Sequence, residues 1–128
     1  MKTIIAGSRS IKDIELVRGA ISECNWEITE LVSGCARGID SLGEEVAKEL
    51  NIPVKQFKPN WNDIEGKPEH LIKSNSYGKY YVLAGHERNT AMRDYAEACI
   101  VITNGSSGSA DMIKKAREGN LLLKVMEV

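Results

Sequence analysis

Three short segments of the chain are rich in glycine, serine and arginine, residues that together suit the binding of an anion. They are Gly7-Ser8-Arg9, SGCARGID (33–40) and NGSSGS (104–109). Glycine lets the backbone approach a ligand closely, and the forked guanidinium of arginine pairs with two oxygens of a phosphate or carboxylate. The first N–H groups of a helix have no intrahelical partner and attract negative charge. Because a helix is expected soon after each segment, we predict a shared phosphate-binding site.

Each segment also has a simpler explanation when it is taken alone. Ser109 would serve as a helix N-cap, with the neighbouring glycines only making the turn. Asp40 would oppose the helix dipole or pair with Arg37, and Arg9 would be an ordinary surface arginine. Convergence of the three segments on one edge favours the binding site.

A fourth candidate segment is AGHERNTAM (84–92). Arg88 and Asn89 are expected at the start of a helix, where they would reach toward the same edge. His86 and Glu87 have side chains suited to acid–base chemistry, although a solvated turn explains this pair more simply. Cys35 is interpreted as a small space-filling residue.

Short apolar runs alternate with stretches of helical periodicity along the whole chain. The expected strands are 3–6, 28–33, 54–57, 98–103 and 121–128. The expected helices are 12–24, 39–50, 88–98 and 109–118. This alternation predicts an α/β, Rossmann-like, doubly wound fold with a mainly parallel five-stranded sheet in the order 3-2-1-4-5. In such a sheet, the loops that follow the strands gather at one edge, where ligands bind.

Residues 58–84 interrupt this alternation and are predicted to be an irregular insert in a single domain spanning 1–128. The insert begins near Trp61 and contains three of the four tyrosines, Tyr77, Tyr80 and Tyr81. Long irregular segments inside small domains are usually functional or disordered. Trp61, or one of these tyrosines, is a candidate to stack on a base, although each has core or lid packing as the simpler role.

The composition narrows the class of partner. Seventeen basic and eighteen acidic residues leave a net charge of −1, which disfavours nucleic acid and anionic membranes as partners. Three cysteines without CxxC spacing predict a reduced, cytoplasmic protein with no disulfide framework and no zinc site. We also expect no other metal site and no cofactor. We find no apolar run long enough for a signal peptide or a membrane-spanning helix.

The motifs, taken in order, resemble the SLOG superfamily and most closely its YspA-like branch. That branch has the pattern GSR, SGxARGxD, a tryptophan, AGxxRNxxM and SxGTxxMI, and this chain has GSR, SGCARGID, Trp61, AGHERNTAM and SSGSADMI. The resemblance extends over nearly the whole chain. It implies binding of a nucleotide or a nucleotide-derived, ADP-ribose-like ligand, as a sensor, carrier or sequestering module, and it allows a homo-oligomer. The ligand-binding residues predicted from the segments and the resemblance are Gly7, Ser8, Arg9, Gly34, Arg37, Gly38, Asp40, Trp61, Arg88, Asn89, Gly105, Ser107, Gly108 and Ser109.

Two other functions stay open at this stage. The LONELY GUY enzymes of the superfamily hydrolyse the N-glycosidic bond of a nucleoside monophosphate, and similarity to them implies that Arg88 positions the substrate. Their catalytic glutamate corresponds to Met112, which cannot ionise, so an N-glycosidase or deoxyribosyltransferase would have to use Glu87, Asp111 or Asp40 instead. The chain also resembles DNA-processing protein A, which binds single-stranded DNA. This third function would call for a basic groove with stacking aromatics, whereas aromatic residues make up only 5% of the chain.

Overall fold

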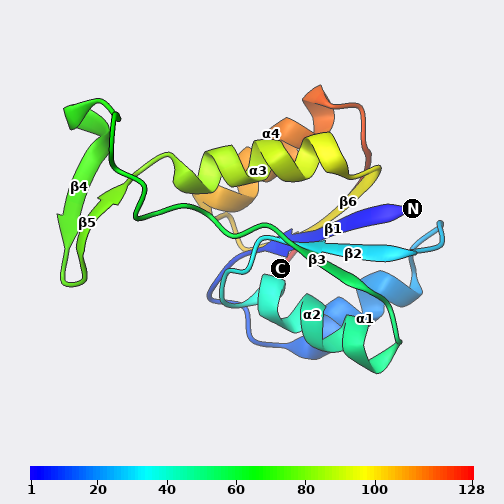
Figure 1. Cartoon of the computed structure of the whole chain (residues 1–128). Coiled ribbons are helices and arrows are strands. Elements are labelled where there is room, and N and C mark those ends of the chain that lie inside the picture. Colours follow the sequence, from blue (N-terminus) through cyan, green and yellow to red (C-terminus); the bar gives the residue numbers. More distant parts are fainter.

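Five parallel strands form the central sheet, in the order β3-β2-β1-β6-β7 (Figure 1). The computed structural model describes all 128 residues. The strands of the sheet are β1 (Lys2–Gly7), β2 (Glu30–Ser33), β3 (Val54–Gln56), β6 (Ala98–Thr103) and β7 (Leu122–Glu127). Counted along the chain within this sheet, the order is 3-2-1-4-5, so the predicted α/β fold and its strand order are confirmed.

The four helices cover both faces of the sheet, which makes the fold doubly wound. Figure 1 shows α1 (Ile14–Ser22) and α2 (Ile39–Glu49) on one face, and α3 (Ala84–Tyr95) and α4 (Ser107–Glu118) on the other. Successive strand residues point to opposite faces, so Ile5 packs in the core with α1 and α2 while Ile4 packs in the core with α3 and α4. No helix is both long enough and apolar enough to cross a membrane.

Helix α3 begins at Ala84, four residues before the predicted start at residue 88. Gly85 lies inside the first turn of α3. A Cβ at this position would come within 3.2 Å of the Trp61 ring, so the glycine allows the helix to pack closely on that ring. Arg88 therefore lies in the second turn of α3 and not at its start.

The expectation of an irregular insert is wrong for its second half. Residues 69–71 form a short 3₁₀ helix, η1 (Glu69–Leu71), and β4 (Ile72–Asn75) pairs antiparallel with β5 (Gly78–Tyr81). A two-residue turn joins the strands, and Gly78 after it has a φ of 118°. The alternation of apolar residues is weak here because the hairpin extends from the body of the molecule and is mostly exposed (Figure 1).

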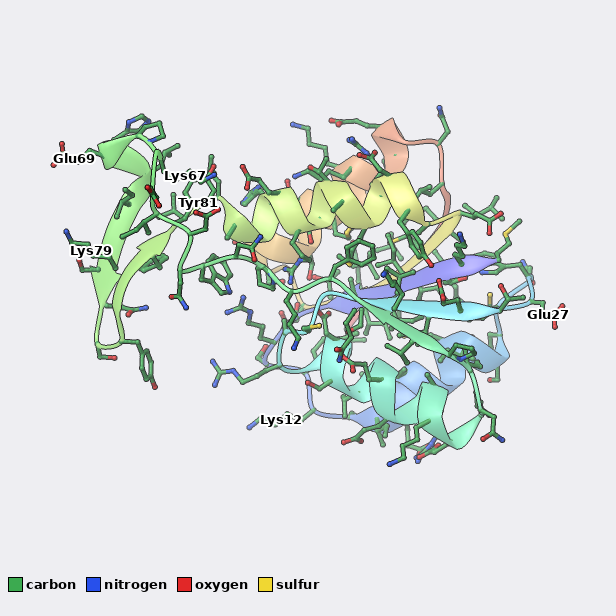
Figure 2. All side chains as sticks on the ribbon, in the orientation of Figure 1. Lys12, Glu27, Lys67, Glu69, Lys79 and Tyr81 are labelled. Atoms are coloured by element: carbon green, nitrogen blue, oxygen red, sulfur yellow. The ribbon has the colours of Figure 1, made fainter.

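Backbone hydrogen bonds hold the base of this hairpin against the rest of the chain. The Tyr81 amide donates to the Trp61 carbonyl at 2.7 Å, and the Val82 amide donates to the Leu71 carbonyl at 2.9 Å. Figure 2 shows Tyr81 on the side of the hairpin that faces α3, near Lys67, whereas Lys79 points away from the body. The hairpin therefore fixes the position of Trp61.

Gly7, at the end of β1, is required by close packing. A Cβ here would lie 2.0 Å from the Ile102 carbonyl oxygen and 2.7 Å from Cγ1 of Ile39. The substitution Gly7→Ala should lower the free energy of unfolding by about 1–3 kcal/mol, because β1 and β6 would have to move apart. Urea denaturation followed by circular dichroism measures this change.

Gly19→Ala is the matched control, because a Cβ at Gly19 in the middle of α1 would have no heavy atom within 4 Å. It should raise the free energy of unfolding by roughly 0.5–1 kcal/mol through helix propensity. A similar loss of stability in both variants would contradict the packing argument.

Candidate functional site

A cavity of about 500 Å³ opens at the carboxyl ends of β1 and β6. Here the strand order reverses, because β1 lies between β2, which follows it in the chain, and the much later β6. Ligands of open α/β sheets bind in the crevice at such a switch point. We call this cavity the main cavity. It is lined by predicted ligand-binding residues from all four candidate segments and from the insert: Gly7, Ser8, Arg9, Asp40, Trp61, Arg88, Asn89, Ser107, Gly108 and Ser109.

The other predicted residues lie outside the wall of the main cavity. Arg37 is exposed and does not line it, so of the three predicted ligand-binding arginines only Arg9 and Arg88 line this cavity. Gly38 and Gly34 do not line the cavity but pack against residues that do. A Cβ at Gly38, whose φ is 73°, would lie 2.5 Å from the Ser8 carbonyl oxygen. Gly105, with a φ of 98°, shapes the turn that leads into α4.

A chain of hydroxyl groups joins the loop after β1 to the loop after β6. The Ser8 hydroxyl lies 2.9 Å from that of Ser106 and 3.3 Å from that of Thr103, and Ser106 lies 2.7 Å from the hydroxyl of Ser109. The Asn104 amide also donates to Ser8 Oγ at 3.0 Å. These bonds hold the loop after β1 against the loop after β6, although the two are nearly 100 residues apart in sequence.

The first turn of α4 has no side-chain cap. Its N-cap is Ser106, whose hydroxyl is engaged with Ser8 and Ser109 and bonds no backbone amide of the helix. The simpler explanation of Ser109 as the N-cap is therefore wrong: Ser109 lies inside the first turn and is buried. The leading N–H groups of α4 stay available to a ligand.

Arg88 crosses the gap between α3 and the loop after β2. One Nη donates to the Gly34 carbonyl, and Nε donates to Asn89 Oδ1 at 2.9 Å. A Cβ at Gly34 would lie 2.8 Å from this guanidinium, so a larger residue would require the Arg88 side chain to shift. Burial lowers the pKa of Arg88, and the nearby Asp40 carboxylate opposes that effect.

Asp40 is the acidic residue on the wall of the main cavity, and only 4% of its surface is exposed. Its Oδ2 accepts a hydrogen bond from the Ala36 amide at 3.1 Å. Burial raises the pKa of Asp40, and this effect exceeds the opposite influence of the Ala36 amide and of Arg88.

Of the three carboxylates considered for catalysis, Asp40 lies on this wall, whereas Glu87 and Asp111 lie off it. Asp111 accepts bonds from Lys115 at 2.7 and 2.8 Å and from Asn89 at 2.9 Å. Burial alone would raise the pKa of Asp111, but the hydrogen bonds from Lys115 and Asn89 bring it below its usual value. Glu87 is exposed and accepts a bond from the Tyr81 hydroxyl at 2.9 Å. Met112 lies on the wall but belongs to the core.

Ser106 and His86 are wall residues that sequence reasoning left out of the predicted set. His86 Nδ1 lies 3.1 Å from Asp111 Oδ1. Ser106 could have been predicted from the sequence, because serine is a preferred N-cap residue and Ser106 lies three residues before Ser109, one turn away. The contact between His86 and Asp111 joins different helices and leaves no local signal. Nowhere in the chain do three His, Cys, Asp or Glu side chains form a group able to hold a metal ion.

The buried carboxyl of Asp40 predicts a pH-dependent effect of Asp40→Asn. A carboxyl whose folded pKa is raised stabilises the fold fully below its unfolded pKa, and that contribution is lost as pH rises through the folded pKa. The free energy of unfolding of the variant, relative to the parent, should therefore increase as pH rises from about 4 toward 7. Urea denaturation across this range measures the trend. Asp63→Asn, at an exposed loop position, is the matched control, and a flat or falling difference for Asp40→Asn would contradict the assignment.

Residues 1–63 match the model of a family described as the YspA, cpYpsA-related SLOG family. Among solved structures, the X-ray structure of DNA processing protein A from Streptococcus pneumoniae superposes with a TM-score of 0.70 at 19% identity. The superposition covers 97% of this chain and 49% of that one, so this chain spans about half of its length. No curated protein matches the chain in sequence.

At this identity the structural likeness shows the fold alone. The family match covers the segments around Gly7-Ser8-Arg9 and SGCARGID and reaches past Trp61, which are the first three motifs of the resemblance seen in the sequence. The resemblance is thereby confirmed. The first 63 residues, just under half of the chain, thus match the YspA, cpYpsA-related SLOG family, and the whole chain has the fold of DNA processing protein A.

Proposed function

We propose that this protein binds a nucleotide or a nucleotide-derived ligand in the main cavity. The observation that carries the proposal is the start of α4, which lines this cavity and has no side-chain cap, while Arg88 lines the same cavity. A volume of about 500 Å³ lies within the range of small-molecule sites.

The start of α4 would hold the phosphate. Ser107, Gly108 and Ser109 offer backbone N–H groups at the positive end of the helix dipole. A glycine in this turn leaves room for an oxygen to approach, because a Cβ at Gly108 would meet nothing within 4 Å. Arg9, exposed at the mouth of the cavity, would add a second positive charge.

Other residues that line the main cavity suit a nucleoside. The Trp61 ring packs against Gly85 and is contacted edge-on by Tyr80, with 6.3 Å between the ring centroids. Because Trp61 also lines the main cavity, its supported ring would offer a surface on which a base stacks. Asp40 and Asn89 provide oxygen acceptors for ribose hydroxyls or for the edge of the base.

A second candidate function is hydrolysis of the N-glycosidic bond, and the contact between His86 and Asp111 favours it. The Asp111 carboxylate would orient the imidazole, leaving Nε2 to accept a proton from water. The oxygen of that water would bond to C1′ of the sugar while the base departs with the bonding electrons and takes up a proton. We rank it second because the wall of the main cavity has Met112 where the relatives have a catalytic glutamate.

Nucleic acid is the third candidate. It is motivated only by the name of the similar structure, DNA processing protein A. The net charge of −1 does not favour it. A test of nucleotide binding should therefore include a single-stranded oligonucleotide.

Calorimetric titration with nucleoside monophosphates and ADP-ribose tests the leading proposal. Arg88→Ala should weaken binding by roughly 10- to 100-fold, as expected for the loss of hydrogen bonds from a charged group. Arg37→Ala is the matched control, because this arginine lies outside the main cavity, and it should bind like the parent. Equal losses in both variants, or no binding by the parent, would count against the site.

Chromatographic detection of free base after incubation with the same monophosphates tests the second candidate. The leading proposal predicts binding without release of base. If base is released, His86→Ala should reduce the rate by roughly 100-fold or more, which is the usual contribution of a general base. Release that is unaffected by this substitution would remove His86 from the mechanism.

A further inference from the structure

A second cavity, of about 390 Å³, adjoins the main cavity on the other side of Arg88. Arg88 lines both cavities, and the consecutive residues Asn60 and Trp61 line one each. The wall of the second cavity is formed by residues 55–60, which comprise the end of β3 and the residues after it, and by residues of α3. We call it the Lys58 cavity.

The charged groups of the Lys58 cavity are mainly positive. Lys55, Lys58 and Arg88 line it, against the single carboxylate of Glu87. None of the three cations has a carboxylate oxygen within 4.0 Å, and Glu87 is engaged by the Tyr81 hydroxyl. Like charges gathered on a concave wall without counter-charges create a local potential that attracts anions.

The same wall also presents an aromatic surface. Phe57 lines the Lys58 cavity and packs against Tyr95 with 5.4 Å between the ring centroids. Lys55 Nζ lies 5.8 Å from the Phe57 centroid, which keeps the ammonium group close to this ring. Positive charge beside an aromatic ring is the combination that binds a phosphate together with its base.

We infer that the Lys58 cavity is a second nucleotide subsite, which binds the next phosphate and base of a ligand whose first nucleotide occupies the main cavity. This inference rests on the proposed function. The ligand class is two nucleotides joined by a phosphodiester, which exists as a free dinucleotide or as the end of a single strand.

Arg88 is placed to link the two subsites. A guanidinium has five N–H donors, and the Gly34 carbonyl and Asn89 Oδ1 each accept a bond from one of them. The remaining donors can contact the phosphodiester between the two nucleotides. A mononucleotide would leave the lysines of the Lys58 cavity without a partner.

Calorimetric titration of the full chain with AMP and with a 5′-phosphorylated diadenylate tests the inference. The diadenylate should bind about tenfold or more tightly than AMP, since it adds charge-assisted contacts. Replacing both Lys55 and Lys58 with glutamine should remove this gain and leave AMP affinity within about twofold. Lys79→Gln, on the side of the hairpin that points away from the body (Figure 2), is the matched control and should leave both affinities unchanged.

Salt dependence gives an independent measurement. For diadenylate, the slope of log affinity against log salt should be steeper than for AMP by roughly 0.7 for each added phosphate contact, and the double variant should lose that excess. Titration with a 5′-phosphorylated strand of about twelve nucleotides distinguishes a free dinucleotide from a strand end as the ligand. Competition by the strand supports a strand end as ligand, and binding of diadenylate alone supports a free dinucleotide.

Two outcomes would overturn the inference and can be told apart. If AMP binds and diadenylate binds no more tightly, or if the double variant weakens both equally, the second subsite is absent while the main cavity stands. If neither ligand nor any nucleoside monophosphate binds, the proposed function fails together with the inference that rests on it.

Discussion

Close contact between the ends of β1 and β6 is the constraint on which the rest of the site depends. Gly7 brings the backbone of β1 against the Ile102 carbonyl, and the Ser8 amide donates to that carbonyl at 3.1 Å. The Ser8 hydroxyl can then reach Ser106 and the start of α4. A side chain at residue 7 would separate the two loops, and the hydroxyl network could not form.

A half-buried arginine without a carboxylate within ion-pair distance is costly, and here neutral acceptors stabilise it. Arg88 is held by the Gly34 carbonyl and by Asn89, while Asp40 lies close enough to reduce the cost of burial. An arginine that is bonded only to neutral acceptors keeps its full positive charge and can still attract an anion. Under the proposed function, a phosphate in the main cavity would supply the counter-charge that the protein does not place against Arg88.

The insert after β3 contributes more to the site than its irregular sequence suggests. Trp61 at its beginning is fixed by a hairpin that pairs with itself and barely touches the core. The preceding residues 55–60 form the basic wall of the Lys58 cavity. One connection between β3 and α3 thus supplies both the aromatic face of the main cavity and the positive face of its neighbour.

The order of strands and helices, the loops that meet at the sheet edge and the family resemblance follow from the sequence alone. They depend on local apolar periodicity, on glycine and on short motifs, all of which are readable along the chain. The tertiary structure decided which side chains face the cavity: Arg88 but not Arg37, and Ser106 together with Ser109. It also decided that Asp111 pairs with Lys115 and His86, away from the wall. Side-chain direction depends on contacts between residues distant in sequence, such as Arg88 with Gly34, 54 positions away, and no local pattern encodes them.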